Sequence, residues 1–469
     1  MAGRADPARS GRADPARRAA YDVLRAVTDR DAYANLLLPA LLARRGLGGR
    51  DAAFATELAY GTLRGRGTYD AILAACSDRD DLDPPVRDVL RLGAHQLLAT
   101  RVGSHAAVAT SVDLARDVCG ARPAGFVNAV LRKVATRDLD AWVSIVAPSR
   151  AADPSGYLAV RYGYPRWIVA AFGDALGAAA GGEIEDALAA CNARPEVTLA
   201  VLPPGQPDAA EPLSRTRWSP FGYRLPGGDP APLVAGGRAA VQDEASQLAA
   251  LALARAGPAR AGGSSGPERL WLDLCAGPGG KARLLSALAA ASGARLVASD
   301  LRPRRAAQVL RALRSAGSGP DRAAVVTADG RRGPWRPGLF DRVLADVPCS
   351  GLGSLRRRPE ARWRKSPADV AGLAGLQRDL LGAALEAARP GGVVAYVTCS
   401  PHVAETRQVV TAVTDRRGDV TILDAPAVLA EVPGLRCPGD GDPRSARFAQ
   451  FWPHRHGTDA IFLALLSRG

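Results

Sequence analysis

Residues 269–281 read RLWLDLCAGPGGK, and this stretch decides the fold. An apolar run of strand length ends at Asp273, a glycine-rich turn follows, and the chain continues in the helical pattern RLLSALAAA. Glycines in such a turn let the backbone approach a ligand at a helix N-terminus, the position where open α/β sheets bind nucleotides. The turn has the spacing of neither a P-loop nor a dinucleotide fingerprint, so the pattern disfavours ATP and NAD as ligands.

The same alternation of apolar strand, turn and helix recurs towards the C-terminus. It predicts an α/β fold, a doubly wound and mostly parallel sheet. A final apolar segment, DAIFLALLS, predicts a late antiparallel strand. The expected parallel strands are RLWLDLCA, RLVASD, AAVVTAD, FDRVLADV and GVVAYVTC.

Two further strand ends are acidic and narrow the class of ligand. Asp300 follows the second expected strand and Asp329 the third. A carboxylate after the second strand is well placed to bind a ribose diol. A single Asp at such a place is more often a helix cap or turn residue. Acidic and glycine-rich loops at one edge of one sheet together favour an adenosine-type cofactor.

Two cysteines follow the fourth and fifth expected strands. Cys349 stands in the run Asp346-Val-Pro-Cys-Ser, and Cys399 lies between Thr398 and Ser400. If these strands are neighbours, both thiols emerge at the edge that carries the cofactor loops. Cys76, Cys119 and Cys191 are instead expected to be small buried apolar residues.

A thiol beside a methyl donor suits the chemistry of cytosine. Carbon 5 of that ring is a poor nucleophile until a group such as a thiolate adds to carbon 6. Asp346 could then hydrogen-bond ring nitrogen 3 and the exocyclic amine. The base must be unstacked for this chemistry, which points to single-stranded or flipped-out RNA. Sequence spacing leaves open which of the two cysteines attacks.

A basic run follows Cys349 directly and surrounds a tryptophan. Such a run beside a reactive thiol predicts an RNA-binding patch with an aromatic stacking partner, although a solvated charge run is the simpler alternative. The expected RNA-binding residues are Arg356, Arg357, Arg358, Arg362, Trp363, Arg364 and Lys365.

Four regions are expected along the chain. Residues 1–16, which contain the heptad GRADPAR twice, predict a disordered tail. Residues 17–145 have helical periodicity and predict an all-helical domain. Residues 146–240 are rich in Pro and Gly and predict a small connecting subdomain, and residues 241–469 carry the α/β pattern.

Composition limits the classes of protein and partner. The chain of 469 residues has a formal net charge of +14, which favours a polyanionic partner such as RNA, even though codon bias can explain the dominance of arginine. No apolar stretch approaches the roughly 20 residues of a membrane helix, and no signal peptide is expected. Seven cysteines without a CxxC pair disfavour a disulfide framework and a structural zinc, so a reducing cytoplasm is predicted.

Together these residues resemble the Nop/Sun family of RNA 5-methylcytosine methyltransferases, in particular the bacterial group that methylates small-subunit ribosomal RNA. The resemblance covers the chain from about residue 241 onward. The N-terminal helical region resembles a NusB-like RNA-binding domain, especially in AFATELAYGTLR and GFVNAVLRKV. The matching C-terminal segments are DLCAGPGGK, DVPCSGLGSLRRRPEARW, LQRDLLGAALEAARPGGVVAYVTCS and FWPHRHGTDAIFLALL.

The resemblance implies an S-adenosylmethionine-dependent enzyme acting on 16S ribosomal RNA. It implies that Cys399 is the nucleophile and that Cys349 assists release of the product; Asp346 is the third candidate catalytic residue, from the ring chemistry described above. The segment after Cys399 retains Glu405 but has Thr406 where Asn is common in the family. The implied cofactor contacts are Cys275, Ala276, Gly277, Pro278, Gly279, Gly280, Lys281, Asp300, Asp329 and Asp346.

Alternative functions differ in substrate or in activity. The same cysteine pair would serve a transfer RNA cytosine, whereas methylation of a protein or a small molecule would not need two thiols. A non-catalytic RNA-binding assembly factor is a further alternative, but both cysteines and the loop glycines are present. No metal site and no obligate protein partner are expected.

Overall fold

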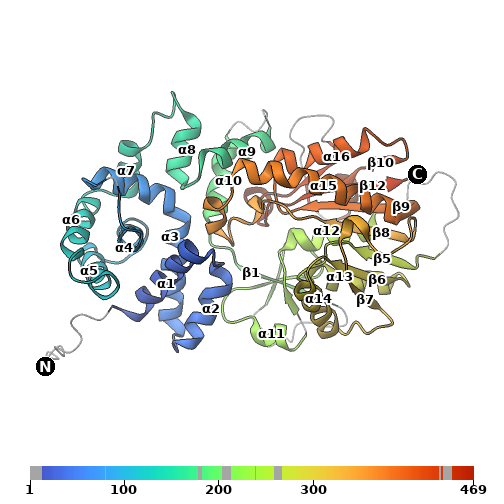
Figure 1. Ribbon diagram of the computed structural model, residues 1–469, viewed down its shortest axis with the longest axis horizontal. Helices are drawn as coiled ribbons and strands as arrows, with labels where there is room; N and C mark the ends of the chain where they lie inside the picture. The colour runs from blue at the N-terminus through green and yellow to red at the C-terminus, as the bar shows by residue number, and fades with distance from the viewer. Residues whose placement is uncertain are drawn as a thin grey trace. The chain divides into compact units, whose positions relative to one another are not determined.

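The described chain divides into two compact units, each with its own hydrophobic core. One unit is helical and comprises the residues up to Ala170 together with Arg357–Arg364, and the other comprises Ala171–Arg356 and Lys365–Gly469. Figure 1 shows helices alone in the blue part of the chain and sheets only from the green part onward. The computed structural model describes residues 13–79, 81–177, 182–202, 213–237, 239–257, 267–432, 435–436 and 446–469.

The helical unit is a bundle whose helices bury one apolar face each. Its core contains Leu58, Leu90 and Leu131, all of them fully buried. Asp83 precedes α4, and the helix starts at Pro84, whose fixed backbone angle suits a first turn. The helices are α1 (Pro15–Arg30), α2 (Ala34–Arg44), α3 (Gly49–Cys76), α4 (Pro84–Ala99), α5 (Ser104–Cys119), α6 (Ala124–Val134), α7 (Leu139–Val146) and α8 (Pro154–Tyr162), followed by the first turn of α9 (Arg166–Leu176).

A small antiparallel sheet opens the second unit. Its strand order is β2-β3-β1-β4, and Leu199, Tyr223 and Leu225 form its core. The sheet leads into α12 (Glu244–Arg255), which starts with Asp243 as its cap. The other elements of this region are α10 (Glu183–Asn192), β1 (Val197–Val201), β2 (Ser214–Arg215), β3 (Gly222–Leu225), α11 (Ala231–Ala235) and β4 (Ala239–Val241).

The main sheet of the second unit has the strand order β10-β12-β9-β8-β5-β6-β7, with β11 paired to β12. Strands β5 to β9 are parallel, and β12 is antiparallel to β9, so the doubly wound sheet and the late antiparallel strand are both confirmed. The strands are β5 (Leu270–Asp273), β6 (Arg295–Asp300), β7 (Ala323–Thr327), β8 (Phe340–Asp346), β9 (Ala388–Thr398), β10 (Val420–Leu423), β11 (Ala449–Gln450) and β12 (Phe462–Arg468).

Helices cover both faces of this sheet because successive strand residues point to opposite sides. In β9, Ala395 and Val397 contribute to one core and Val394 and Tyr396 to the other. Helices α12, α13 (Gly280–Ala291) and α14 (Pro303–Ser315) lie on the first face, and α15 (Pro367–Ala387) and α16 (Arg407–Thr414) lie on the second. The short elements are η3 (Gly330–Arg332), η4 (Leu352–Ser354), η5 (Pro359–Trp363), η6 (Val403–Glu405), α17 (Ala425–Leu429) and α18 (Pro453–His456).

The structural division cuts across the predicted connecting region. Residues 146–170 belong to the helical unit and residues 171–240 to the sheet unit. Of the predicted disordered tail, residues 1–12 lie outside the described part, and α1 begins at Pro15 with the Asp14 side chain accepting from the Arg17 amide. The predicted domain boundaries at residues 145 and 240 stay predictions. Among the described helices, none is long and apolar enough to span a membrane.

Candidate active site

The glycine-rich loop between β5 and α13 is shaped for close backbone approach. Gly279 has a φ of 112°, and a Cβ there would lie 2.8 Å from the Ala312 Cβ and 3.1 Å from the Val309 Cα. The Gly277 amide donates to Asp300 Oδ2 at 3.1 Å, and a Cβ at Gly277 would lie 2.3 Å from that oxygen. Both positions therefore require glycine, and the loop presents bare backbone at the start of α13.

The two acidic strand ends differ in their surroundings. Asp300 is 5% exposed and also accepts from the Arg302 amide at 2.8 Å, which fixes its carboxylate beside the loop. Asp329 caps the turn η3 and binds Arg331 at 2.7 Å. The hydrogen bond from the Arg331 side chain is the main reason that the pKa of Asp329 lies below its usual range. The Asp300 carboxylate is therefore held beside the glycine-rich loop, whereas the Asp329 carboxylate is held by the turn that follows its own strand.

A buried glutamine near the loop was missed by sequence reasoning. Gln242 is 6% exposed, and neither its amide oxygen nor its amide nitrogen has a hydrogen-bond partner among the described residues. A Cβ placed at Gly280 would lie 4.0 Å from the Gln242 Cδ, so this amide faces the loop. An unpartnered buried amide, a glycine cradle and a carboxylate fixed beside that cradle are groups that fit the amino-acid and ribose parts of S-adenosylmethionine.

Lys281, in the first turn of α13, forms an ion pair with Asp346, the last residue of β8, which precedes the loop that contains Cys349. Its Nζ donates to Asp346 Oδ2 at 2.8 Å, and its side chain is 10% exposed. Burial opposes the charge on Lys281, but the attraction of Asp346 and then of Cys399 outweighs burial and raises the pKa of the amine above its usual range. Lys281 is therefore an ammonium group, and by reciprocity its charge attracts a thiolate at Cys399.

Asp273, at the end of β5, is fully buried beneath this pair. Neither of its carboxylate oxygens has a hydrogen-bond partner within the usual distance and angle limits among the described residues. Burial, and then the charge of Asp346, raises the pKa of Asp273 from 3.8 to about 8. The carboxyl group is consequently neutral at pH 7, a second feature that the strand pattern alone did not indicate.

We expect the contribution of Asp273 to the free energy of unfolding to fall as the pH rises from about 4 to about 8. In this window the folded protein holds a proton on Asp273 that the unfolded chain has lost, so rising pH favours the unfolded state. The limiting slope is about 1.4 kcal/mol per pH unit. Asp273→Asn removes this titration, so its free energy of unfolding should change with pH by a more positive slope than that of wild type in urea unfolding at pH 5, 6.5 and 8. Asp321→Asn, which removes an exposed carboxylate, is the control; an equal pH slope in all three proteins would contradict the prediction.

The two cysteine-bearing loops lie side by side, as expected for neighbouring strands. Strands β8 and β9 are paired in parallel up to Asp346 and Val397. Beyond them, the Gly353 amide donates to the Cys399 carbonyl at 2.9 Å. Ser350 Oγ and Ser400 Oγ lie 3.2 Å apart. Both thiols are partly exposed and sit at the carboxyl edge of the sheet, where the glycine-rich loop also lies.

The two thiols differ electrostatically. Burial is the main cause that raises the pKa of Cys349 well above its usual value, followed by the charges of Cys399, Glu405 and Asp346. Cys349 is thus a neutral thiol near pH 7. Cys399 instead faces the ammonium group of Lys281. The arrangement can therefore support one nucleophilic thiolate and one proton-carrying thiol.

The structure corrects the predicted RNA-binding patch. Arg362 is fully buried in the helical unit, where its guanidinium lies 3.7 Å from the centre of the Tyr164 ring and donates to the Arg64 carbonyl at 3.0 Å. Arg364 donates to backbone carbonyls of α1 and the turn after it, including Val27 at 3.1 Å. Because Arg362 is fully buried, it cannot lie on an exposed RNA-binding surface, and the prediction is wrong for this residue. Arg364 is partly exposed, and RNA contact by it stays a prediction.

The other members of the run are divided between the two units. Trp363 packs in the helical unit, where the Arg66 guanidinium lies 5.2 Å from its ring centre. Arg356 is partly exposed, at 12% of its side chain, and forms ion pairs within the sheet unit. Arg357 and Lys365 are partly exposed and Arg358 is exposed. RNA contact by these last three residues stays a prediction.

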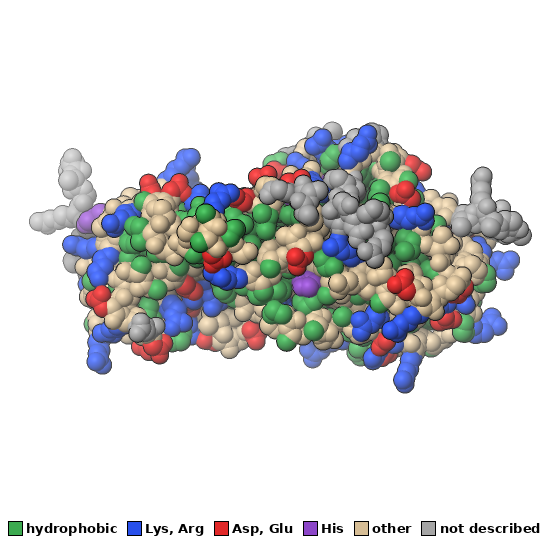
Figure 2. Space-filling view, turned by 90° about the horizontal axis from the view of Figure 1, so that it is seen from above, with side chains coloured by type: hydrophobic (Ala, Val, Ile, Leu, Met, Phe, Trp, Pro, Cys, Tyr) green, Lys and Arg blue, Asp and Glu red, His purple; other side chains and the backbone are tan. Residues whose placement is uncertain are grey.

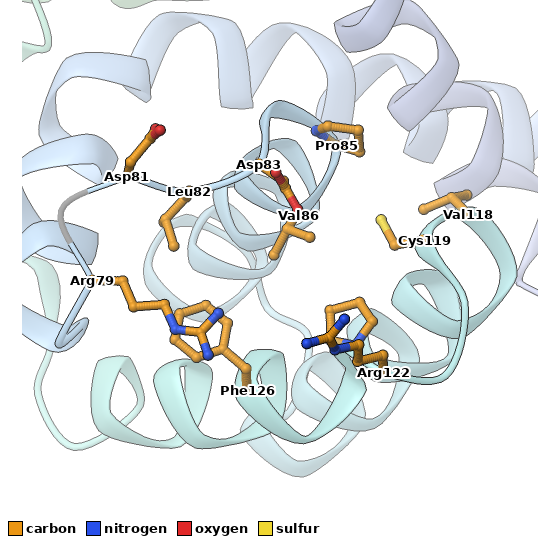
Figure 3. A pocket seen from close by; sticks show the side chains of 11 residues that line it. Arg79, Asp81, Leu82, Asp83, Pro85, Val86, Val118, Cys119, Arg122 and Phe126 are labelled. Atoms are coloured by element: carbon orange, nitrogen blue, oxygen red, sulfur yellow. The ribbon is translucent and has the colours of Figure 1, made fainter.

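Cationic groups are interspersed with acidic ones on the face drawn in Figure 2. In the helical unit, a separate cavity of about 750 Å³ also has mixed charge, with Arg79 and Arg122 opposite Asp83 (Figure 3). Cys119 lines this cavity and is partly exposed, unlike the buried Cys76 and Cys191, so the expectation of a buried thiol is wrong at Cys119.

In the described part of the chain, no group of three or more His, Cys, Asp and Glu could hold a metal ion.

The parallel sheet, its glycine-rich loop and its acidic strand ends define an S-adenosylmethionine-dependent methyltransferase. Residues 265–467 match the family model described as 16S rRNA methyltransferase RsmB/F, and residues 14–136 match the NusB family. The ribosomal RNA small subunit methyltransferase B of Pseudomonas syringae is 33% identical over 90% of this chain and 91% of the relative. The chain belongs to the RsmB/F family of RNA methyltransferases and carries a NusB-like helical domain.

Further relatives and solved structures agree with this assignment. A Mycobacterium tuberculosis protein whose name mentions only methyltransferase is 51% identical over 99% of this chain and 97% of its own. The crystal structure of the protein PH0851 has a TM-score of 0.74 and 20% identity, and covers 97% of this chain and 98% of its own. A methyltransferase homologue from Pyrococcus horikoshii has a TM-score of 0.53 and 20% identity over 69% of this chain and 100% of its own. These two structures support the fold alone.

Proposed function

We propose that this protein methylates carbon 5 of a cytosine in 16S ribosomal RNA through a covalent adduct between Cys399 and carbon 6 of the base. The observation that carries the proposal is that two thiols lie on adjacent loops beside the glycine-rich loop, one of them protonated and the other facing an ammonium group. A methyltransferase acting on a nucleophilic nitrogen or oxygen would need neither thiol. The names of the relatives that act on small-subunit ribosomal RNA support the choice of RNA.

Cys399 is proposed to begin the reaction as a thiolate held by the Lys281 ammonium. Its sulfur forms a bond to carbon 6, the electron pair of the 5,6 double bond moves to the 4,5 bond, and that of the 3,4 double bond moves to nitrogen 3. Nitrogen 3 takes a proton from solvent, which it returns once carbon 5 is methylated, and Asp346 can accept a hydrogen bond from this N–H. Asp346 Oδ2 is held by Lys281, and Asp346 Oδ1 has no hydrogen-bond partner among the described residues. S-adenosylmethionine supplies the electrophilic methyl group that carbon 5 takes up, with loss of S-adenosylhomocysteine.

Cys349 is proposed to take part in release. After methylation, carbon 5 must lose its proton to a base, so that the double bond re-forms and the bond from carbon 6 to sulfur breaks. Cys399 carries no negative charge while it is bonded to the base, so one of the charges that keep Cys349 protonated is then absent. Cys349 then gives up its own proton to solvent more readily, and the resulting thiolate can take the proton of carbon 5.

The substrate is tested by bisulfite sequencing of ribosomal and transfer RNA from cells with and without the gene. We expect one cytosine of the small-subunit RNA to lose its methyl group when the gene is deleted and to regain it on complementation. Loss of methylation in transfer RNA instead would show that the proposed reaction is right but that transfer RNA, and not 16S ribosomal RNA, is the substrate. Unchanged cytosine methylation in both RNAs, with the purified protein still binding S-adenosylmethionine, would overturn the proposed function.

A further inference from the structure

Glu405 is a buried carboxylate that lies between the two cysteine-bearing loops. The side chain is fully buried. Its Oε1 accepts from the Ser350 amide at 2.7 Å, and its Oε2 accepts from Ser350 Oγ at 2.5 Å and from Ser400 Oγ at 2.7 Å. Ser350 directly follows Cys349, and Ser400 directly follows Cys399. One carboxylate thus binds the immediate neighbours of both thiols.

Further hydrogen bonds hold the Glu405 carboxylate and its backbone in place. The Tyr396 hydroxyl donates to the Glu405 carbonyl at 2.7 Å, which ties its backbone to strand β9. Gln377 on α15 donates from Nε2 to Glu405 Oε1 at 3.2 Å and to the Pro348 carbonyl at 2.8 Å, and so holds the other side of the Pro-Cys loop. Removal of the carboxylate would leave the Ser350 amide and two hydroxyl groups without their buried acceptor.

We propose that Glu405 is a positioning residue that sets the distance and orientation of Cys349 relative to Cys399, and that it is needed chiefly for product release. The inference rests on the proposed function, because it assumes that Cys399 forms the adduct and that Cys349 assists its breakdown. Glu405 reaches both loops through the serines and does not itself contact the reacting atoms.

The release step should be the more sensitive to this geometry. Formation of the adduct needs only Cys399, which is held by β9 and attracted by Lys281. Breakdown of the adduct needs a group on the neighbouring loop to reach the proton on carbon 5 while Cys399 remains bonded to carbon 6. A shift of the order of 1 Å between reacting groups can slow a step about a hundredfold.

Two substitutions of Glu405 distinguish an effect of its hydrogen bonds to the serines from an effect of its negative charge. Glu405→Ala removes every side-chain contact to the two serines. Glu405→Gln can keep them, because its oxygen can accept from the Ser350 amide while its NH2 group donates to the two serine hydroxyls, which accept as readily as they donate. The positioning hypothesis therefore expects the Gln variant to resemble wild type and the Ala variant to fail.

The experiment incubates the full-length protein with S-adenosylmethionine and substrate RNA, and measures methylated RNA together with protein–RNA complexes that survive denaturing gels. We expect Glu405→Ala to lose at least tenfold in turnover and to accumulate the covalent complex, while Glu405→Gln stays within about threefold of wild type. Retained affinity for S-adenosylmethionine shows that the sheet unit is folded. If Glu405→Ala does not fold, Ser400→Ala removes one arm of the contact and should show the same accumulation to a smaller degree.

Glu244→Ala is the matched control, since Glu244 is another buried glutamate of the same unit and accepts from the amides of Trp218 and Ser219. This variant should not accumulate the covalent complex. Wild-type turnover in Glu405→Ala, loss of turnover without the complex, or equal failure of the Gln and Ala variants would each overturn the proposal. Methyl transfer by Cys399→Ala would instead show that the proposed function is wrong.

Discussion

Cys399→Ala is expected to lower methyl transfer at least about 10⁴-fold, because the variant has no nucleophile to activate carbon 5. The effect should fall on the chemical step alone. Cys399 lies on the loop after β9, whereas the glycine cradle lies after β5, so affinity for S-adenosylmethionine should stay within about threefold of wild type. Single-turnover methylation and isothermal titration measure the two quantities separately.

Cys349→Ala should behave in the opposite way with respect to the covalent complex. Cys399 can still attack in this variant, but the breakdown of the adduct is slow, so a complex with RNA should persist on denaturing gels. Cys399→Ala should give no complex, and Cys191→Ala, which removes a buried thiol of α10, should match wild type in both assays. If Cys399→Ala forms a complex and Cys349→Ala does not, then Cys349 is the nucleophile and Cys399 assists release.

Gly353→Ala is expected to lower methyl transfer about a hundredfold through displacement of the Cys399 loop. A Cβ at Gly353 would lie 1.8 Å from the Ala460 carbonyl oxygen and 2.9 Å from the Cys399 carbonyl oxygen. Both oxygens belong to the backbone, so the loops must move apart, and the hydrogen bond from the Gly353 amide to Cys399 lengthens or breaks. Single-turnover methylation and the yield of covalent complex measure this effect.

Gly372→Ala is the matched control for this change. Gly372 lies within α15, and a Cβ there meets nothing within 4 Å. Alanine should stabilise this helix by about 0.5–1 kcal/mol without altering activity. If Gly353→Ala retains wild-type activity, the close approach of its loop to Cys399 is not required for the reaction.

Local pattern determined most of the sheet unit. The strands that end at Asp273, Asp300 and Asp346 form where apolar runs are followed by glycine-rich or acidic turns, because each strand is buried on both faces. The pattern predicted these strands and the loops that carry Cys349 and Cys399, but it left open whether the strands are neighbours; the fold pairs β8 with β9. Strand periodicity and turn chemistry are properties of neighbouring residues and can be read without the fold.

Contacts between residues far apart in the sequence could not be predicted from local patterns. Lys281 and Asp346 are 65 positions apart, and their ion pair depends on two loops meeting at one sheet edge. Asp273 looks like any acidic strand end, yet its burial beside Asp346 raises its pKa to about 8. Glu405 occupies a segment whose sequence suggested only an uncertain role, and its four hydrogen bonds to three side chains and one amide appear only when the loops are packed.

The basic run after Cys349 shows the limit of sequence patterns most clearly. By itself the sequence determined a cluster of positive charge around Trp363 and the order of strands, glycines and cysteines of a methyltransferase. The packing of the chain buries Arg362 fully, and it binds Arg364, which stays partly exposed, to backbone carbonyls of the helical unit. The physical reason is that a charged side chain carries no local signal of burial: a guanidinium group is as readily satisfied by backbone carbonyls and an aromatic ring as by water or phosphate.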